Sequence, residues 1–241
     1  MFNIDKNYYD LKPSGIGALS ILWNNYKDIV KNEAIDVNQW LDEFFFCLLG
    51  GYGITYELNE SAFLILKNKG LFEKQIFAKS EDSIFQLFQN ELNRRQFSPR
   101  GKNGNFRAYR FPNSKGLILT KAGKWLKDVC DFKLENVFSM ENSSQENRNF
   151  LLSCPGFGYK SSSWFLRNIG LGSNLAILDI HIYRTLLDFG IIPENLQVQT
   201  NYLEIEDYFC KACDLINAKP ELMDLIIWMW ARKGNEKNAR L

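Results

Sequence analysis

The sequence predicts an all-α fold with little or no β structure, and three observations favour it. Apolar residues recur at spacings of three and four over most of the chain, which is the periodicity of amphipathic helices. Strict alternation of apolar and polar residues, which is typical of a half-buried strand, is scarce. The 241 residues are 46% hydrophobic and 15% aromatic, so the chain can bury a core as one compact unit or two small lobes.

Ten segments of the chain have the helical spacing. They are residues 17–30, 38–49, 61–72, 83–92, 118–130, 147–153, 160–169, 179–189, 202–216 and 221–231. Loop-forming residues separate several of them: Ser98–Asn105 follows the fourth segment, and Pro155–Gly158 follows the sixth. Asp179 comes after an apolar run and is typical of a helix N-cap, so the eighth segment begins there. Short β segments are expected near residues 53–57 or 106–111.

Charge and hydropathy narrow the function classes. The 29 basic and 28 acidic residues nearly balance, which argues against a protein that coats nucleic acid through its net charge. No apolar run reaches the roughly 20 residues that a bilayer span needs, and the first ten residues lack the pattern of a signal peptide. We therefore expect a cytoplasmic protein without a membrane segment.

The five cysteines favour buried thiols over disulfides, because their number is odd and most of them lie in apolar runs. Only Cys210 and Cys213 form a CxxC pair. With a single histidine in the chain, a zinc or iron–sulfur site lacks ligands, so no cluster is expected.

One segment of the chain is strongly basic. Ten basic residues and no acidic residue lie between Leu92 and Lys127. Aromatic residues alternate with arginines where Phe106, Tyr109 and Phe111 occur, and this pattern suits phosphate contact combined with base stacking. A solvated basic loop whose aromatic residues anchor in the core is the alternative interpretation.

The segment Leu151–Gly170 holds the most informative motif. Gly156 and Gly158 permit a tight turn between two helices, and the turn and the second helix N-terminus together present backbone N–H groups to an anion. A helix, a Gly-x-Gly hairpin and a helix can therefore hold a phosphate. An ordinary connection between two helices is the alternative.

Three further residues supply chemistry next to this hairpin. Lys160 lies in the first turn of the second helix, where the positive helix end favours the neutral amine that attacks an aldehyde-like carbon. Asp179 supplies a carboxylate that can stabilise positive charge on a sugar, and its N-cap role is compatible with this. His181, two residues later, can donate to a phosphate, or it is a partly buried side chain of the structure.

These residues carry a resemblance to a known family. The segments PGFGYKSSSWFLRNIG and AILDIHIYRTLLDFGII resemble the helix-hairpin-helix DNA glycosylases of the HhH-GPD superfamily, and the archaeal-type 8-oxoguanine DNA glycosylase/AP lyases are the most similar branch. Similarity continues in FFCLL at Phe45–Leu49, in Tyr109–Trp125 and in Tyr202–Trp230. The resemblance implies one HhH-GPD unit over residues 1–241, with lobes at 38–130 and 131–237 and an N-terminal helical extension at 1–37.

The resemblance implies a bifunctional enzyme that excises 8-oxoguanine from DNA. Lys160 matches the lysine that forms the Schiff base, and Asp179 matches the catalytic aspartate. The damaged nucleotide is flipped out of the duplex, the base is expelled, and the imine proceeds to strand nicking. Gly156, Gly158, Tyr159, His181, Arg107 and Arg110 are the implied DNA contacts, and Tyr52 is the candidate to fill the gap in the duplex.

The resemblance also implies a base pocket and a cation. Phe111 and Trp228 match the two rings that sandwich 8-oxoguanine, while Asp224 and Lys237 match the residues that read it. The carbonyl oxygens of Leu152, Cys154 and Phe157 are implied ligands of a structural Na⁺ or K⁺, and no further cofactor is required. We expect a monomer whose partner is damaged DNA. Two alternatives stay open: the same chemistry on a different modified purine, and a helix-hairpin-helix module that binds DNA without catalysis.

Overall fold

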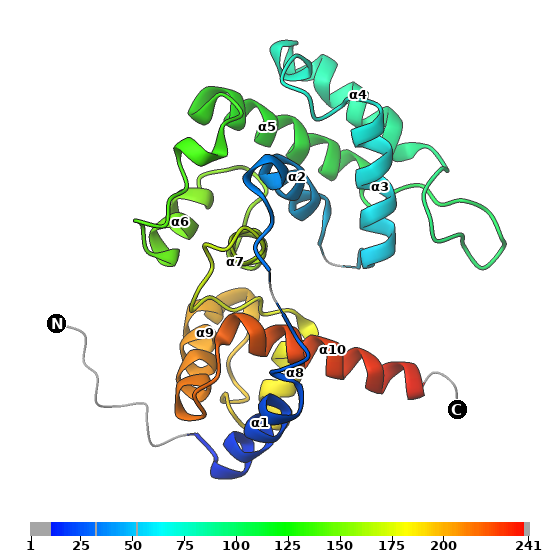
Figure 1. Ribbon diagram of the computed structural model, residues 1–241. Coiled ribbons are helices and arrows are strands. Elements are labelled where there is room, and N and C mark those ends of the chain that lie inside the picture. The colour runs from blue at the N-terminus through cyan, green and yellow to red at the C-terminus, as the bar shows by residue number, and fades with distance from the viewer. Residues whose placement is uncertain (1–10, 32, 52, 239–241) are drawn as a thin grey trace. The chain divides into compact units, whose positions relative to one another are not determined.

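The computed structural model describes residues 11–31, 33–51 and 53–238, with side chains up to residue 232 (Figure 1). All ten predicted helices are present in this part of the chain, so the all-α prediction is confirmed. Their bounds are α1 Pro13–Tyr26, α2 Trp40–Leu49, α3 Tyr56–Asn68, α4 Glu81–Asn93, α5 Pro112–Cys130, α6 Ser144–Leu151, α7 Tyr159–Asn168, α8 Ile180–Asp188, α9 Val198–Leu215 and α10 Pro220–Asn238. Short 3₁₀ helices cover Val37–Gln39, Ile76–Ala78 and Leu134–Asn136.

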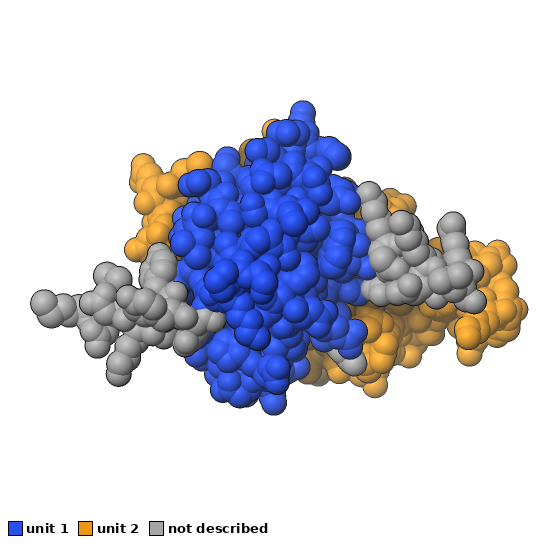
Figure 2. All heavy atoms as spheres, turned by 90° about the horizontal axis from the view of Figure 1, so that it is seen from below, with its two compact units in different colours: residues 1–34, 172–241 blue, residues 35–171 orange. Residues whose placement is uncertain are grey.

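The chain forms two compact units, which are coloured separately in Figure 2. Unit 1 combines residues 1–34 with residues 172–241, and unit 2 is the continuous segment 35–171. This division differs from the expected lobes at 38–130 and 131–237. The reason is packing: α6 and α7 pack in unit 2, where α7 contacts α2, while α1 packs on α9 and α10 of unit 1.

In unit 2, α2 is the central helix and packs against α3, α5 and α7 (Figure 1). Its apolar sequence explains this position, because Phe44, Phe45, Leu48 and Leu49 are all buried. Aromatic rings continue the core on both sides of α2. Burial of such large side chains supplies most of the stability of a helical unit.

Unit 1 packs α1 and α9 against α10, which also contacts α8. Its core contains Leu19 of α1, Leu186 of α8, Phe209 of α9 and Ile227 of α10, none of which is exposed. A Cβ atom at Gly15 would lie 2.1 Å from the carbonyl oxygen of Phe189. Glycine is therefore required for the close approach of α1 to the end of α8.

The expectation of β segments was wrong at both places. Residues 54–55 are irregular and α3 begins at Tyr56, because Thr55 caps that helix by accepting a hydrogen bond from the Leu58 N–H group. Within residues 106–111, only Arg107 pairs in β fashion, in an isolated antiparallel bridge with Phe97. Apolar alternation there reflects residues that anchor a loop.

Candidate active site

The predicted hairpin lies between α6 and α7 in unit 2. Ser143 and Glu146 form a capping box at the start of α6, and the turn that follows leads to α7 at Tyr159. Gly156 has φ +95°, and a Cβ atom there would lie 2.3 Å from Cγ2 of Ile118. At Gly158 a Cβ atom would meet nothing within 4 Å, so this side of the turn is open. Gly156 is required by the turn itself, whereas Gly158 leaves room for a ligand.

The hairpin and the start of α7 keep several backbone donors available. Among the described residues, the backbone N–H groups of Gly156, Lys160 and Ser161 donate no hydrogen bond to a backbone carbonyl. The Gly158 N–H group instead donates to Ser161 Oγ at 3.0 Å. A helix N-terminus with unused N–H groups attracts an anion. The predicted phosphate site is thus supported by donors at Gly156 and in the first turn of α7, with Gly158 used internally.

Lys160 is exposed on the first turn of α7. Side-chain contacts between α6 and α7 hold the residues around it. Tyr159 is half-buried, with its ring centroid 5.4 Å from the guanidinium carbon of Arg148. Arg148 is 3% exposed and donates from Nη1 to Ser163 Oγ at 3.2 Å, which ties α6 to α7. Sequence reasoning missed Arg148 and Ser161. A serine three residues after a glycine helix start was the available signal for Ser161.

The turn also contains the carbonyl groups expected to bind a monovalent cation. Cys154 O accepts the Phe157 N–H group at 3.2 Å, while the carbonyl oxygens of Leu152 and Phe157 accept no hydrogen bond from the described residues. Carbonyl oxygens are ligands that hard cations prefer. The donor chemistry of the turn fits a cation, and the cation itself stays a prediction.

Asp179 caps α8 in unit 1, as its position in the sequence predicts. Its Oδ1 accepts the N–H groups of His181 at 2.7 Å and Ile182 at 2.9 Å. The second carboxylate oxygen, Oδ2, makes no hydrogen bond to the described residues, and the side chain is half-buried. His181 is half-buried in the first turn of α8. One oxygen of Asp179 therefore holds the helix start, which leaves the other for chemistry.

Buried polar side chains hold the segment that leads to Asp179. Glu206 accepts the Ala176 N–H group at 2.9 Å, and Asp224 accepts the Ile177 N–H group at 2.8 Å. The Tyr202 hydroxyl accepts the Leu178 N–H group at 3.2 Å and donates to Ala176 O at 2.6 Å. We call Tyr202, Glu206 and Asp224 the polar cradle. Sequence reasoning missed Tyr202 and Glu206, whose spacing of four on one helix was the available signal.

The residues expected to form the base pocket lie in both units. Asp224 is only 1% exposed and belongs to the polar cradle, while Trp228 is half-buried one turn later on α10, with the Arg232 guanidinium carbon 5.1 Å from its ring. The side chain of Lys237 lies outside the described residues. Phe111 belongs to unit 2, is 49% exposed and has φ 60° and ψ 52°. Such a backbone is strained for a non-glycine residue and often marks a functional position.

The loop that contains Tyr52 is held by basic side chains from the start of α5. Tyr52 itself lies outside the described residues. Lys115 Nζ donates to Leu48 O at 2.7 Å and to Gly50 O at 2.5 Å, and Arg110 Nη1 donates to Gly53 O at 3.0 Å. Burial lowers the pKa of the Lys115 amine from 10.5 to about 8. Arg110 and Lys115, expected as members of a basic surface, thus also bind the backbone of unit 2.

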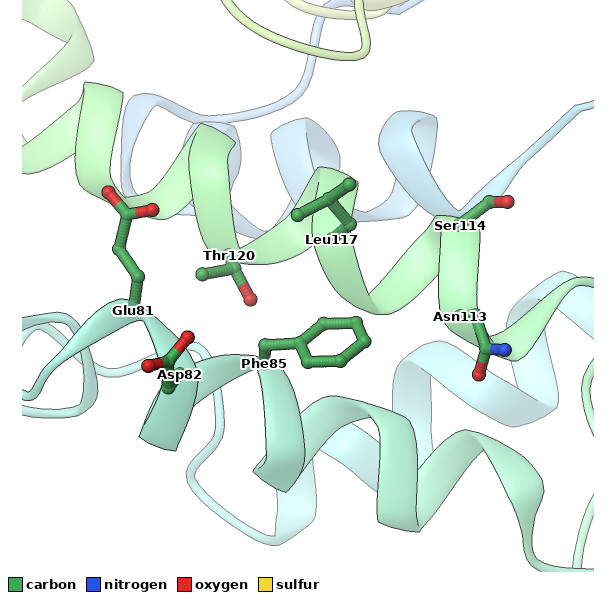
Figure 3. Close-up of a pocket in the computed structure, with 7 residues that line it drawn as sticks. All are labelled: Glu81, Asp82, Phe85, Asn113, Ser114, Leu117 and Thr120. Atoms are coloured by element: carbon green, nitrogen blue, oxygen red, sulfur yellow. The ribbon is translucent and has the colours of Figure 1, made fainter.

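One hollow in unit 2 does not suit DNA. A hollow of about 320 Å³ between α4 and α5 has Glu81 and Asp82 at its edge (Figure 3), and carboxylates repel phosphate.

The two cysteines of the CxxC pair differ in exposure. Cys213 is buried, which raises the pKa of its thiol, and Cys210 is half-buried. No helix in the described part of the chain is long and apolar enough to cross a bilayer.

Comparison with known proteins places this helix-hairpin-helix protein in a family. A family model described as 8-oxoguanine DNA glycosylase matches residues 22–218, and the chain belongs to this family. A relative in Fusobacterium nucleatum, named 8-oxoguanine DNA glycosylase/AP lyase, is 33% identical over 122 residues, which are 49% of this chain and 56% of that protein. For this relative, the match spans little more than half of its length. The Methanocaldococcus jannaschii protein of the same name is 29% identical over 200 residues, 79% of each chain.

Solved structures agree with the family assignment. The crystal structure of Methanocaldococcus jannaschii 8-oxoguanine DNA glycosylase has a TM-score of 0.58 and 27% identity, and the match covers 91% of this chain and 94% of that one. The same protein in complex with a 15mer DNA containing 8-oxoguanine has a TM-score of 0.55 and 23% identity, which supports the fold alone. The resemblance inferred from the hairpin and Asp179 segments is confirmed at the level of the family.

Proposed function

We propose that this protein is a bifunctional DNA glycosylase/AP lyase that excises 8-oxoguanine from DNA. The observation that carries the proposal is the hairpin before α7, where open N–H groups and an exposed lysine share one helix start. Membership of the family and the names of the relatives support the substrate. A module that only binds DNA has no use for the Asp179 oxygen that the helix cap leaves unbonded, because a carboxylate repels phosphate.

In the proposed reaction, Lys160 is the nucleophile. The damaged nucleotide leaves the base stack. The Lys160 amine attacks C1′ of the sugar, the N-glycosidic bond breaks, and the base departs with the bonding electrons and takes up a proton. The new C–N adduct loses a proton, O4′ leaves C1′ with the bonding electrons and takes up a proton, and the opened sugar carries an imine. Removal of a C2′ proton then expels the 3′ phosphate as the C3′–O bond breaks. This sequence gives both excision and strand nicking without a further cofactor.

Asp179 is proposed to stabilise the positive charge that develops on the sugar as the glycosidic bond breaks. A carboxylate placed in advance is effective because it needs no reorganisation during the reaction. Its Oδ1 is occupied by two N–H groups, so Oδ2 is the oxygen assigned to this role. The helix cap also fixes the position of the side chain.

The remaining predicted residues are proposed to hold DNA and the flipped base. Gly156, Gly158 and Tyr159 are assigned to the phosphate beside the lesion, with His181, Arg107 and Arg110 on the surrounding backbone and Tyr52 in the gap. Phe111, Trp228, Asp224 and Lys237 are assigned to the base. A monovalent cation at the carbonyls of Leu152, Cys154 and Phe157 would stabilise the turn. We propose a monomer that acts on DNA in the cytoplasm.

Single-turnover excision tests this proposal. The protein is incubated in excess with duplexes that carry one 8-oxoguanine, another modified purine, an abasic site or guanine, and strand products are separated before and after alkali treatment. We expect excision and nicking on the 8-oxoguanine strand, with both lost in Lys160→Gln. Excision confined to another purine would show that this purine, and not 8-oxoguanine, is the substrate. The absence of excision and nicking on every strand would contradict the proposed enzyme.

A further inference from the structure

The segment between α4 and α5 carries more positive charge than any function proposed above requires. Residues 94–110, here called the basic arm, include six basic residues and no acidic one, in a chain whose net charge is +1. The arm leaves the helices of its unit as a long loop (Figure 1). Its basic residues are Arg94, Arg95, Arg100, Lys102, Arg107 and Arg110.

The arm is anchored at both of its ends. Phe97 and Tyr109 are buried, with ring centroids 5.7 Å apart, and the Tyr109 hydroxyl donates to Leu49 O at 2.7 Å. The backbone N–H of Ser98 donates to Ser61 Oγ of α3 at 2.9 Å. These contacts fix the direction in which the arm leaves the helices of unit 2.

The tip of the arm is also ordered, although it has no core of its own. Gly101 N–H donates to Asn105 O at 2.8 Å, and Gly104 N–H donates to Gly101 O at 2.9 Å. The Arg100 guanidinium carbon lies 4.2 Å from the ring centroid of Phe106, and its Nη1 donates to Gly104 O at 3.0 Å. An ordered loop loses little conformational entropy when it binds a partner.

Four cations of the basic arm lack carboxylate partners. Among the described residues, Arg95, Arg100, Lys102 and Arg107 form no ion pair, and all four are exposed. Elsewhere in unit 2, Lys67 pairs with Asp42 at 2.5 Å and Lys74 pairs with Asp131 at 2.5 Å. Arg100 and Arg107 each use one N–H group on a backbone carbonyl, so most of their donors remain available.

We propose that the basic arm is a second DNA-binding surface that holds backbone phosphates of the duplex away from the damaged nucleotide. This inference rests on the proposed function for the identity of the polyanion. Phosphate contact is favoured over base stacking because Phe106, the exposed aromatic residue at the tip, already has Arg100 over its ring. The arm therefore adds affinity for DNA of any sequence and leaves the chemistry to the hairpin and Asp179.

The test compares the salt dependence of binding in two variants with equal charge loss. The arm variant is Arg95→Gln with Arg100→Gln and Lys102→Gln, and the control is Lys27→Gln with Lys31→Gln and Lys219→Gln, three exposed lysines of unit 1. Binding to an undamaged 30-base-pair duplex is measured by fluorescence anisotropy between 50 and 300 mM NaCl. The slope of log K against log salt concentration is negative, and each lost phosphate contact reduces its magnitude by roughly 0.9.

We expect the magnitude of this slope to be smaller by about 2 to 3 in the arm variant than in the unaltered protein. In the control it should stay within about 0.5 of the unaltered value. A chain in which residues 99–105 are replaced by Gly-Asn-Gly loses two cations, Arg100 and Lys102, so the magnitude of its slope should fall by roughly 1.8. Equal slopes in the arm variant and the unaltered protein would overturn the proposal.

The same experiment distinguishes this proposal from the proposed function. At low salt with enzyme in excess, the arm variant should excise 8-oxoguanine at the unaltered single-turnover rate. If the unaltered protein binds duplex with the expected slope but excises nothing, the enzyme assignment fails and the arm assignment stands. If excision occurs while the arm variant keeps its slope, the arm assignment fails alone.

Discussion

The segments that carry Lys160 and Asp179 differ in whether their backbone N–H groups are hydrogen-bonded. At the hairpin and the start of α7, the N–H groups of Gly156, Lys160 and Ser161 donate to no backbone carbonyl in the described structure. In the segment before α8, buried side chains of α9 and α10 bind the consecutive N–H groups of Ala176, Ile177 and Leu178. Unused donors are expected where a ligand supplies the acceptor, and a fully bonded backbone is expected where a charge must be held still.

The largest expected effect comes from removing the charge of Asp179 while its helix cap is kept. Asp179→Asn keeps an oxygen that can accept the N–H groups of His181 and Ile182, so α8 should remain capped. Loss of the charge should lower the rate of 8-oxoguanine excision by about 10²–10³-fold, because the charge acts in the transition state. Single-turnover kinetics measures this rate, and thermal unfolding serves as the control for folding. An unchanged excision rate would remove Asp179 from the mechanism.

A pair of glycine variants examines the hairpin. Gly156→Ala has to adopt φ +95° and collides with Ile118, so we expect a loss of about 1–3 kcal/mol in the free energy of unfolding, together with weaker DNA binding. Gly158→Ala meets no protein atom within 4 Å, so its stability should be unchanged while DNA binding falls. Urea unfolding and anisotropy measure both quantities. DNA binding by Gly158→Ala at the unaltered affinity would show that this open side of the turn does not face DNA.

The polar cradle is examined with two tyrosine variants of unit 1. Tyr202→Phe removes the hydroxyl bonded to Ala176 and Leu178, and should reduce excision about tenfold because Asp179 is less well positioned. Tyr183→Phe removes a hydrogen bond to Leu196 O from α8 and is the matched control. Each variant should cost about 1–2 kcal/mol of stability. Equal excision rates in the two variants would show that the cradle serves stability alone.

The smallest expected effect is a pH dependence of stability. The pKa of the Lys115 amine is about 8 in the folded protein, below its ordinary value of 10.5, so above pH 8 the unfolded chain holds a proton that the folded protein has released. The Lys115 amine alone therefore makes the free energy of unfolding rise with pH in this window. Burial raises the pKa of the Cys47, Cys154 and Cys213 thiols and of the Tyr109 hydroxyl, and these groups act in the opposite direction as pH rises. The contribution of Lys115 is therefore measured as a difference: between pH 7.5 and 9.5, urea unfolding should show a less favourable change in the free energy of unfolding for Lys115→Met than for the unaltered protein.

Local patterns were sufficient to predict the helices, the hairpin and the cap at Asp179. Each depends on residues that are close in sequence: apolar spacing for the helices, Gly156 for the turn, and a carboxylate before its own helix for the cap. The family resemblance rests on these same segments. Composition likewise predicted the basic surface that contains the arm.

Contacts between distant residues were not predictable from the sequence. The division into units depends on α1 packing with helices nearly 200 residues away, which no local pattern encodes. Asp224 shares a helix with Trp228, as expected, yet its partner is the backbone of Ile177. Lys115 was counted with the basic surface, whereas burial against the end of α2 directs its amine to Leu48 and Gly50.

Borohydride trapping followed by peptide mapping tests the central claim most directly. The protein is incubated with an oligonucleotide bearing one 8-oxoguanine, reduced with borohydride, digested, and analysed by mass spectrometry. Lys124, whose amine donates to Lys79 O, provides a matched variant on α5. We predict one DNA adduct, located on Lys160, absent in Lys160→Gln and retained in Lys124→Gln. An adduct on another lysine, or trapping that persists in Lys160→Gln, would contradict the assignment of Lys160 as the nucleophile.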